Sequence, residues 1–331
     1  MRDTKELQMT ASGTPEVAAG RSSDDAEGRI VASGLTKVFG GVRAVDGLSF
    51  TVEPGSVTGF LGPNGAGKTT TLRMILGLAK PTAGEGTIGG VPYAHLADPG
   101  RTVGAVLEAT SFHPGRSARN HLRVLCAAAG VPDRRADEVL DIVGLTQAAR
   151  MPARSYSLGM RQRLGLASAL IGDPKVLILD EPSNGLDPEG IVWLRVMLRH
   201  LADTQGRTVL VSSHVLAEVE QAVDRVVIIA RGRLLYDGTL RDLDAGSGTV
   251  VVRTPTPDAL TAALAPLHVT VTSSTDGSVT IAGATLEGVG HAAWQAHVEM
   301  YELRESSSNL EETFLQLTAD PSTARDPEAT R

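Results

Sequence analysis

Gly62-Pro63-Asn64-Gly65-Ala66-Gly67-Lys68-Thr69 is the stretch that decides the fold, and it fits the pattern G-x-x-x-x-G-K-[ST]. It follows the segment 56–61, which is predicted to be a strand, and it opens the segment 68–78, whose apolar residues recur with helical spacing. Glycines let successive backbone N–H groups curve around phosphate oxygens, and the N-terminus of the following helix adds a favourable dipole. The stretch is therefore predicted to be a phosphate-binding loop.

Lys68 and Thr69 carry the polar chemistry of this loop. The Lys68 ammonium is expected to neutralise the β- and γ-phosphates of a nucleoside triphosphate, and the Thr69 hydroxyl to bind Mg²⁺. A match arises by chance in about 1 in 100 chains of this composition, and the strand–loop–helix context makes chance rarer still. The predicted nucleotide contacts are Gly62, Pro63, Asn64, Gly65, Ala66, Gly67, Lys68, Thr69 and Thr70.

A second stretch, Val176-Leu177-Ile178-Leu179-Asp180-Glu181, supplies carboxylates. Four consecutive apolar residues are typical of a buried central strand, and ligands of open α/β sheets bind at the carboxyl ends of such strands. We expect Asp180 to hold the Mg²⁺ shell and Glu181 to activate a water molecule for attack on the γ-phosphate. Alone, an acidic pair after a strand is more often a solvated turn. The phosphate loop favours the functional interpretation.

The composition limits the class of protein. The chain has 331 residues, 42% of them hydrophobic, and a formal net charge of −7, which suits one large globular domain and a smaller one. The negative charge disfavours nucleic acid as a partner. No stretch is apolar over the length that a bilayer requires, and residues 1–28 lack an apolar signal-peptide core and are predicted to be a disordered tail. The one cysteine, Cys126, is interpreted as a buried apolar residue.

The pattern of predicted elements divides the rest of the chain. Strands alternate with helices from residue 29 to 245, which predicts an α/β domain with a largely parallel sheet and a helical subdomain over about 111–170. Residues 246–318 read as strand, helix, strand, strand, helix, strand, which predicts a small C-terminal α+β domain with helices on one face of an antiparallel sheet. Residues 319–331 are predicted to be a second disordered tail. Short helices are also expected over residues 216–223 and 309–317.

Four further features occur in a fixed order around the phosphate loop. The stretch 155–163 reads Ser-Tyr-Ser-Leu-Gly-Met-Arg-Gln-Arg, and the stretch 181–188 reads Glu-Pro-Ser-Asn-Gly-Leu-Asp-Pro. His214 follows the predicted strand 208–212, and Phe39 precedes the phosphate loop. These features resemble, in that sequence, the signature loop, the D-loop, the switch histidine and the adenine-stacking aromatic of ABC ATPases. The resemblance covers residues 30–240 and implies an ABC-type phosphate-loop NTPase domain.

The resemblance also implies a mechanism with two such domains. ATP and Mg²⁺ on the phosphate loop of one domain would be covered by Ser157 and Gly159 of the signature of the other, with Asp187 of the D-loop at the same interface. The catalytic residues implied are Glu181, His214 and Lys68. Because the chain has one phosphate loop and one signature, its partner would be a second copy or a homologous ATPase subunit.

Two features of the sequence depart from the family pattern: the residue after one strand and the signature. Glu108 stands after the predicted strand 103–107 where the family usually has Gln, and its carboxylate is expected to meet Mg²⁺ directly or through water, although when ionised it cannot donate a hydrogen bond. Leu158 and Met160 replace the usual Gly and Gln of the signature, while the small residues Ser157 and Gly159 are kept. We therefore expect an active site, with a rate that these changes can alter.

Simpler interpretations exist for three of these residues. Ser157 fits the N-cap of a helix over 161–171, a lone His214 is more often structural, and a lone Phe39 usually lies in a core. Their order and spacing relative to the phosphate loop favour the functional roles, and a capping Ser157 is compatible with phosphate contact.

The family resemblance implies a transport ATPase. Glu108, the Tyr-Ser-Leu-Gly-Met signature and the C-terminal region resemble bacterial exporters of the antibiotic-resistance and ABC-2 type. Such a subunit would hydrolyse ATP at the cytoplasmic side of the cell membrane, as a peripheral protein bound to a membrane-spanning permease. The alternative is a soluble ABC ATPase that moves no substrate. A phosphate-loop kinase is a third class, which the signature and D-loop oppose.

Overall fold

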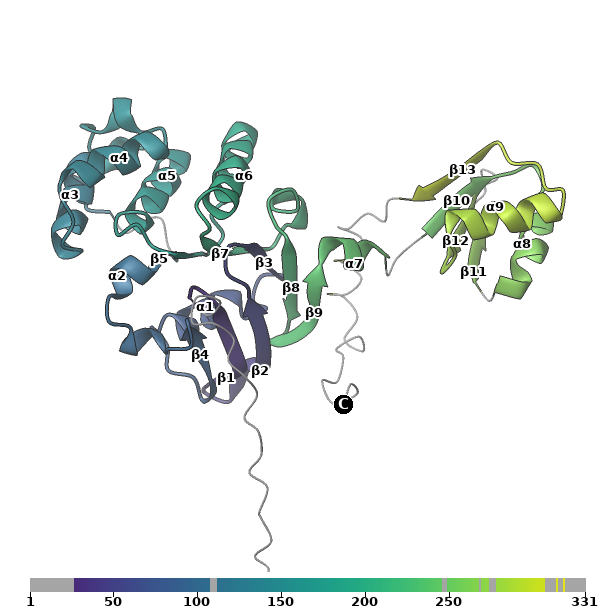
Figure 1. Ribbon diagram of the computed structural model, residues 1–331, viewed down its shortest axis with the longest axis horizontal. Coiled ribbons are helices and arrows are strands. Elements are labelled where there is room, and N and C mark those ends of the chain that lie inside the picture. The colour runs from purple at the N-terminus through teal and green to yellow at the C-terminus, as the bar shows by residue number, and fades with distance from the viewer. Residues whose placement is uncertain are drawn as a thin grey trace, which may run out of the picture.

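A computed structural model describes residues 27–107, 112–245, 249–267, 269–273 and 278–306, together with residues 314 and 318. Figure 1 shows two bodies, an N-terminal one that contains the helices α1 to α7 and a C-terminal one that contains α8 and α9. The described residues contain no helix that combines the length and the apolar character needed to span a bilayer.

The N-terminal body is organised around a six-stranded sheet in the order β5-β6-β7-β3-β8-β9. The first five strands are parallel, and β9 closes the edge antiparallel to β8. All residues of β3, β6 and β7 are buried, as expected for strands covered on both faces, and β6 is apolar at every position. The strands are β3 (Val57–Leu61), β5 (Val103–Val106), β6 (Val176–Leu179), β7 (Thr208–Ser213), β8 (Arg225–Ala230) and β9 (Arg233–Thr239).

A second, antiparallel sheet packs beside the first in the order β2-β1-β4. Its strands are β1 (Ile30–Phe39), β2 (Val42–Val52) and β4 (Ala83–Ile88). The helix α1 (Lys68–Ile75) buries its apolar side in the core between the sheets, where the rings of Phe50 and Phe60 stack with centroids 5.2 Å apart. This packing fixes the helix that starts from the phosphate loop. The connection to β5 contains a short 3-10 turn at Tyr93–His95 and α2 (Pro99–Thr102).

The predicted helical subdomain consists of three main helices that pack on one another. They are α3 (Ala118–Ala128), α4 (Arg134–Ile142) and α5 (Leu158–Ala169), with 3-10 turns at Thr146–Ala148 and Ala153–Ser155. Cys126 on α3 is fully buried, and burial raises the pKa of its thiol. It is therefore the inert apolar residue that the sequence predicts.

The long helix α6 (Pro188–Asp203) follows the D-loop and precedes β7. The short helix expected over 216–223 is reduced to one 3-10 turn at Leu216–Glu218. The reason is that Arg195 of α6 donates hydrogen bonds to the backbone carbonyls of Ala217 and Glu218, the latter at 2.9 Å, so a side chain takes these acceptors in place of the next helical turn.

The C-terminal body has the predicted order of elements. Its strands pair antiparallel in the order β11-β12-β10-β13, the arrangement of a split βαβ or ferredoxin-like unit. Its own core joins the sheet to α8 and α9 through Val250, Leu260, Ile281 and Val289, all buried. The elements are β10 (Thr249–Arg253), α8 (Pro257–Leu264), a 3-10 turn at Ala265–Leu267, β11 (Thr270–Ser273), β12 (Ser278–Ala282), α9 (Leu286–Gln295) and β13 (Glu302–Ser306).

The chain contributes to the N-terminal core again after β13. Phe314, which is 4% exposed, belongs to the same buried cluster as Leu243 of α7 (Leu240–Ala245) and Leu235 of β9. The division of domains at residues 245 and 246 remains a prediction. Most of the helix expected over 309–317 lies outside the described residues.

Ending the chain at Gly246 is expected to leave a folded domain that still binds ATP, because all the nucleotide-binding motifs precede that residue. The same cut removes Phe314, and loss of a buried Phe side chain costs about 3–5 kcal/mol. Urea unfolding of the shortened chain should therefore show a lower free energy of unfolding, and Phe314→Ala in the full chain should show the same loss. Trp294→Ala is the control, because that ring is 74% exposed. Unchanged stability of Phe314→Ala would contradict the packing of this segment.

Candidate nucleotide-binding site

The phosphate loop connects β3 to α1 and contains two glycines that no larger residue can replace. A Cβ atom at Gly62 would lie 2.3 Å from the carbonyl oxygen of Ile229, and one at Gly67 would lie 2.6 Å from that of Ala44. Gly67 also has φ of 107°, in the region that favours glycine. The neighbouring strands therefore approach the loop too closely for side chains at these two positions. The N-terminus of α1, which follows the loop, favours an anionic ligand.

Lys68 is held inside the loop. Its side chain is 6% exposed, and the ammonium Nζ donates hydrogen bonds to the carbonyls of Gly62 at 2.6 Å and Pro63 at 3.3 Å. The same Nζ lies 3.1 Å from Oε1 of Glu181. Burial in a low-dielectric site strengthens such charge interactions, so Lys68 links the loop to the carboxylates at the end of β6.

Asp180 is buried at the carboxyl end of β6 and bonded to two hydroxyl groups. Its Oδ2 accepts from Oγ1 of Thr69 at 2.6 Å, and its Oδ1 accepts from Oγ of Ser212 at 2.5 Å. Asp180 and Thr69 are thus brought together from segments far apart in the sequence, as the prediction of a shared Mg²⁺ site requires. Ser212 was not predicted. The only signal for it was a polar residue at the end of an otherwise apolar strand.

Glu181 has an unusual backbone conformation that several contacts stabilise. Its φ is 49°, in the left-handed region, which costs a residue other than glycine about 1–3 kcal/mol. Its N–H donates to Oγ of Ser212 at 2.9 Å, and its carbonyl accepts from Nε2 of Gln162 at 3.2 Å. These bonds fix the backbone so that the carboxylate is directed at the phosphate loop. Gln162, 5% exposed on α5, is a second residue that sequence reasoning missed.

The Glu181 carboxylate lies between a lysine and a histidine. Oε1 faces Lys68, and Oε2 is 2.7 Å from Nδ1 of His214, which follows β7. An ionised carboxylate only accepts hydrogen bonds, so Nδ1 carries the proton in this contact. The Glu181 side chain is 17% exposed and the His214 side chain 34% exposed. Glu181 therefore contacts both of the other predicted catalytic residues, Lys68 and His214.

Phe39 lies on the surface at the end of β1, 53% exposed. This exposure excludes the interpretation of Phe39 as a core residue. Nζ of Lys37 lies 4.9 Å from the centroid of the ring and donates a hydrogen bond to the carbonyl of Lys80 at 2.6 Å. The ring is therefore held by a cation–π contact while much of its surface stays accessible to a planar ligand.

Replacing Phe39 with Ala is expected to weaken ATP binding without unfolding the protein. Stacking of a base on an aromatic ring contributes about 1–3 kcal/mol, and an exposed side chain contributes little to the core. ATP affinity by calorimetry and thermal stability should be measured on the same preparation, with Val42→Ala as a control at the 70% exposed position just beyond the turn. A loss of stability at unchanged ATP affinity would contradict the stacking role.

The signature residues lie in a different place from the phosphate loop. Ser157 caps α5, with its Oγ accepting from the N–H of Met160 at 3.2 Å, so the predicted cap is present, although the helix begins at Leu158 rather than at residue 161. Ser157 and Gly159 line a cavity of about 530 Å³ together with Gly185 and Asp187 of the D-loop, and no phosphate-loop residue is among those that line it. Asp187 in turn caps α6, accepting from the N–H of Gly190 at 2.8 Å.

The donors present suit a magnesium ion bound mainly through nucleotide phosphates. Mg²⁺ usually takes one or two protein oxygens and fills the remaining positions with phosphate oxygens and water. Thr69 and Asp180 provide such a pair. Among the residues that the structure describes, no group of three or more His, Cys, Asp or Glu side chains forms a metal site of its own. Glu108, the other predicted ligand, lies outside the described residues.

A phosphate loop between a strand and a helix, close to two carboxylates at the carboxyl end of a second parallel strand of the same sheet, defines a nucleoside-triphosphate-binding protein of the phosphate-loop class. Comparison with known proteins is more specific. Residues 45–184 match the family model described as ABC transporter, and residues 248–311 match a domain of unknown function, DUF8746.

Relatives and solved structures agree with that match. The bacitracin transport ATP-binding protein BcrA of Bacillus licheniformis is 45% identical over 61% of this chain and 67% of its own length. The daunorubicin/doxorubicin resistance ATP-binding protein DrrA of Streptomyces peucetius is 34% identical over 90% of this chain and 95% of its own length. A solved structure of an ATP-binding subunit of an ABC transporter superposes with a TM-score of 0.59 at 28% identity, over 65% of this chain and 92% of that one.

The chain belongs to the family of ABC transporter ATP-binding proteins. It is accordingly an ATP-binding transport subunit with the ATPase activity of that family, which confirms the family interpretation of the sequence and decides against a soluble ABC ATPase that moves no substrate. The fold class predicted from the phosphate loop is confirmed as well.

Proposed function

We propose that this chain hydrolyses magnesium-bound ATP within a head-to-tail pair of ATP-binding subunits and thereby drives export through a separate membrane-spanning subunit. The observation that carries the proposal is that two segments far apart in the sequence meet at the carboxyl ends of interior strands. Lys68 comes from one segment, and Asp180 and Glu181 come from the other. The pair would be two copies of this chain or this chain with a homologous ATPase subunit.

The phosphate loop and Asp180 form the binding half of the proposed site. The loop N–H groups and Lys68 hold the phosphates, while Thr69 and Asp180 hold Mg²⁺, with Glu108 proposed from the sequence as a further ligand. When bound, the ion neutralises charge that builds up on the phosphate oxygens. Thr69 and Asp180 already share a hydrogen bond of 2.6 Å, so both oxygens are positioned for one cation.

Glu181 is the proposed general base. Its carboxylate is oriented by Lys68 on one oxygen and by His214 on the other. A carboxylate held in this way at the phosphate loop can accept a proton from water as the water attacks the γ-phosphate. The strained backbone at Glu181 supports the assignment, because such conformations persist where the surroundings enforce them and are frequent at active sites.

The position of the signature supports the pairing of two subunits. Ser157, Gly159 and Asp187 border a cavity that no phosphate-loop residue lines, so within one chain the signature does not cover its own nucleotide. The N-terminus of α5 is suited to bind a phosphate, and in a head-to-tail pair it would meet the nucleotide held by the other subunit.

Export is proposed from the relatives. BcrA is named for bacitracin transport and DrrA for daunorubicin and doxorubicin resistance, and both are ATP-binding proteins of this family. By analogy this chain would work as a peripheral protein on the cytoplasmic side of the cell membrane, bound to a permease that carries the substrate path. Nucleic acid has no part in this proposal.

Co-purification tests the proposal directly. The chain should be expressed with the membrane protein encoded by the neighbouring gene and purified in mild detergent through a tag on the membrane protein. We expect the two proteins to elute together and the ATPase rate to rise when drugs of the classes named for the relatives are added. An active ATPase that never associates with a membrane protein would overturn the transport part of the proposal.

A further inference from the structure

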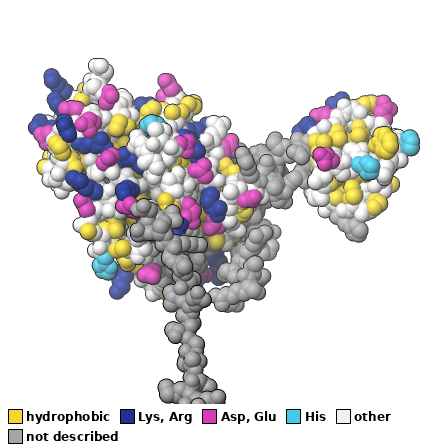
Figure 2. All heavy atoms as spheres, in the orientation of Figure 1, with side chains coloured by type: hydrophobic (Ala, Val, Ile, Leu, Met, Phe, Trp, Pro, Cys, Tyr) yellow, Lys and Arg dark blue, Asp and Glu magenta, His cyan; other side chains and the backbone are white. Residues whose placement is uncertain are grey.

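Glu218 is a carboxylate that the nucleotide site described above does not use, although it lies four residues after His214. It ends the 3-10 turn Leu216–Glu218 and is half-buried. Figure 2 shows the usual arrangement of charged residues, with Lys and Arg interspersed with Asp and Glu over the visible face of the molecule. Glu218 differs from such solvated side chains, because its carboxylate is bonded to two buried hydroxyl groups.

The two hydroxyl groups belong to serines that lie beside the residues of the catalytic contact. Oε2 of Glu218 accepts a hydrogen bond from Oγ of Ser183 and a longer one, of 3.3 Å, from Oγ of Ser213. Ser183 is 3% exposed and Ser213 is fully buried. Ser183 lies two residues after Glu181, in the D-loop. Ser213 directly precedes His214. One carboxylate therefore bonds both segments that supply the contact between Glu181 and His214.

The two links differ in how firmly they hold. A serine hydroxyl has one hydrogen to donate, and Oγ of Ser213 has a second acceptor within reach, the carbonyl of Val215 at 3.0 Å. The same Oγ accepts from the N–H of Val215 at 3.0 Å. Oγ of Ser183 donates to Glu218, and no other acceptor for it is found among the described residues. The bond from Ser183 is therefore the firmer link between Glu218 and the site.

The backbone of the turn is fixed, so the Glu218 carboxylate has a rigid base. Arg195 of α6 donates from Nε to the carbonyl of Glu218 at 2.9 Å and from Nη2 to that of Ala217. Leu216 within the turn and Val219 after it are each 1% exposed. Because α6 begins where the D-loop ends, these contacts close a ring that runs from the D-loop along α6 to Glu218 and back to the D-loop.

Glu181 is the residue that needs such a frame. Its backbone has φ of 49°, a conformation that persists only where the surroundings enforce it. The turn directly after it is closed by the N–H of Leu186, which donates to the carbonyl of Ser183 at 3.0 Å. A shift of Ser183 would move the Glu181 carboxylate relative to His214, and a misplacement of about 1 Å at a reacting group can cost about 10²-fold in rate.

We propose that Glu218 is a positioning residue for ATP hydrolysis. It holds the D-loop against the segment that carries His214, chiefly through Ser183, and so keeps the Glu181 carboxylate aligned. This role rests on the assignment of Glu181 as general base in the proposed function. A Glu218 with a purely structural role would change the stability of the protein and leave the chemical step as it is, so the test measures both.

The first measurement is single-turnover ATP hydrolysis by the full chain, beside its affinity for ATP. We expect Glu218→Ala to lower the rate of the chemical step by about 10–100-fold. The dissociation constant for ATP should stay within about threefold of the parental value, because binding and chemistry depend on different contacts. Glu218→Gln keeps the size and an acceptor oxygen, so its rate should recover to within about fivefold of the parental one. Glu220→Ala, at a half-buried glutamate of the same segment, is the control and should match the parent.

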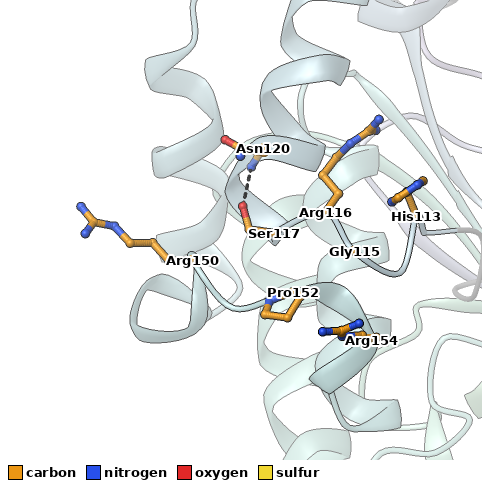
Figure 3. A pocket seen from close by; sticks show the side chains of 8 residues that line it. All are labelled: His113, Gly115, Arg116, Ser117, Asn120, Arg150, Pro152 and Arg154. Carbon is orange, nitrogen blue, oxygen red and sulfur yellow. Dashed lines mark hydrogen bonds between the residues drawn. The ribbon is translucent and has the colours of Figure 1, made fainter.

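The second measurement concerns the serine. Ser183→Ala should lower the same rate by about tenfold, and adding it to Glu218→Ala should lower the rate no further, because both changes remove one contact. Ser117→Ala is the control for a loss of stability. Its Oγ caps α3 by accepting from the N–H of Asn120 at 3.3 Å, the dashed bond in Figure 3, at a cavity that no phosphate-loop or D-loop residue lines. We expect this control to unfold at a lower temperature and to hydrolyse ATP at the parental rate.

The third measurement separates positioning from structure. In a Glu181→Gln background, Glu218→Ala should lower the rate by less than about threefold, because the carboxylate that Glu218 aligns is gone. A loss of full size in this background would overturn the positioning role, and so would a parental rate in Glu218→Ala alone. If Glu181→Gln itself hydrolyses ATP at the parental rate, the proposed function loses its general base. If Glu181→Gln is impaired and Glu218→Ala is not, only the positioning role of Glu218 fails.

Discussion

Glu181→Gln is expected to lower the rate of ATP hydrolysis by about 10²–10⁴-fold, the usual loss when a positioned general base is removed. Gln has the size of Glu and still accepts a hydrogen bond through its carbonyl, but it cannot take the proton of the attacking water. ATP binding should persist, because its contacts come from the phosphate loop and from Thr69. Phosphate release under single-turnover conditions measures the effect on chemistry.

The same variant should accumulate as an ATP-bound dimer. Hydrolysis is the step expected to reopen the closed pair, and removal of a negative charge near the γ-phosphate favours closure further. Size-exclusion chromatography with ATP and Mg²⁺ reports the oligomeric state. Glu85→Gln, at an exposed position of β4, is the matched control. Hydrolysis by Glu181→Gln at near the parental rate would falsify the catalytic assignment, whereas an inactive monomer would leave that assignment intact and contradict the trapped dimer.

Lys68→Ala is expected to weaken ATP binding by about 10–150-fold, because a hydrogen bond to a charged group contributes about 1.5–3 kcal/mol. The Lys68 ammonium lies at the centre of the loop, held by the carbonyls of Gly62 and Pro63, so no other side chain of the loop replaces it. Hydrolysis should fall as well, since Oε1 of Glu181 loses its cation. Isothermal titration with a slowly hydrolysed ATP analogue measures the affinity.

The control for this variant is Lys175→Ala, which removes a lysine that is 59% exposed and ion-paired with Glu27 at the surface. Thermal unfolding of Lys68→Ala guards against a trivial loss of structure. Removing one partner of a buried ion pair leaves the other without compensation, so a modest decrease in stability is expected in the absence of nucleotide. Parental ATP affinity in a folded Lys68→Ala protein would contradict the role of this residue in phosphate binding.

Much of the fold is determined by local sequence patterns. The run Val176–Leu179 is apolar at every position and forms the buried strand that such a run predicts. The bounds of α8 and β10 also agree with the sequence, since Pro257 can start a helix and three consecutive valines favour a strand. The helix expected over 216–223 fails because a residue distant in sequence, Arg195, binds its carbonyls. Only tertiary contacts reveal such competition.

The candidate site, like the fold, was predictable from the sequence in part only. Its residue types and order were readable because phosphate binding requires glycines, a lysine and a hydroxyl at fixed spacing within one loop. The contacts that orient Glu181 were not readable, because Gln162 reaches it from α5, and Ser212 and His214 reach it from the end of β7. The exposed position of Phe39 likewise follows from its place at the turn between β1 and β2, not from its residue type.

The sequence by itself determined the phosphate loop, the acidic strand end and the family, because these depend on short stretches whose spacing is set by backbone geometry. Only the tertiary structure shows that no phosphate-loop residue lines the cavity beside the signature, and that Phe314 belongs to the same buried cluster as Leu243. The physical reason is that burial and charge balance depend on which segments meet in space, and segments separated by many residues leave no periodic signal of their meeting.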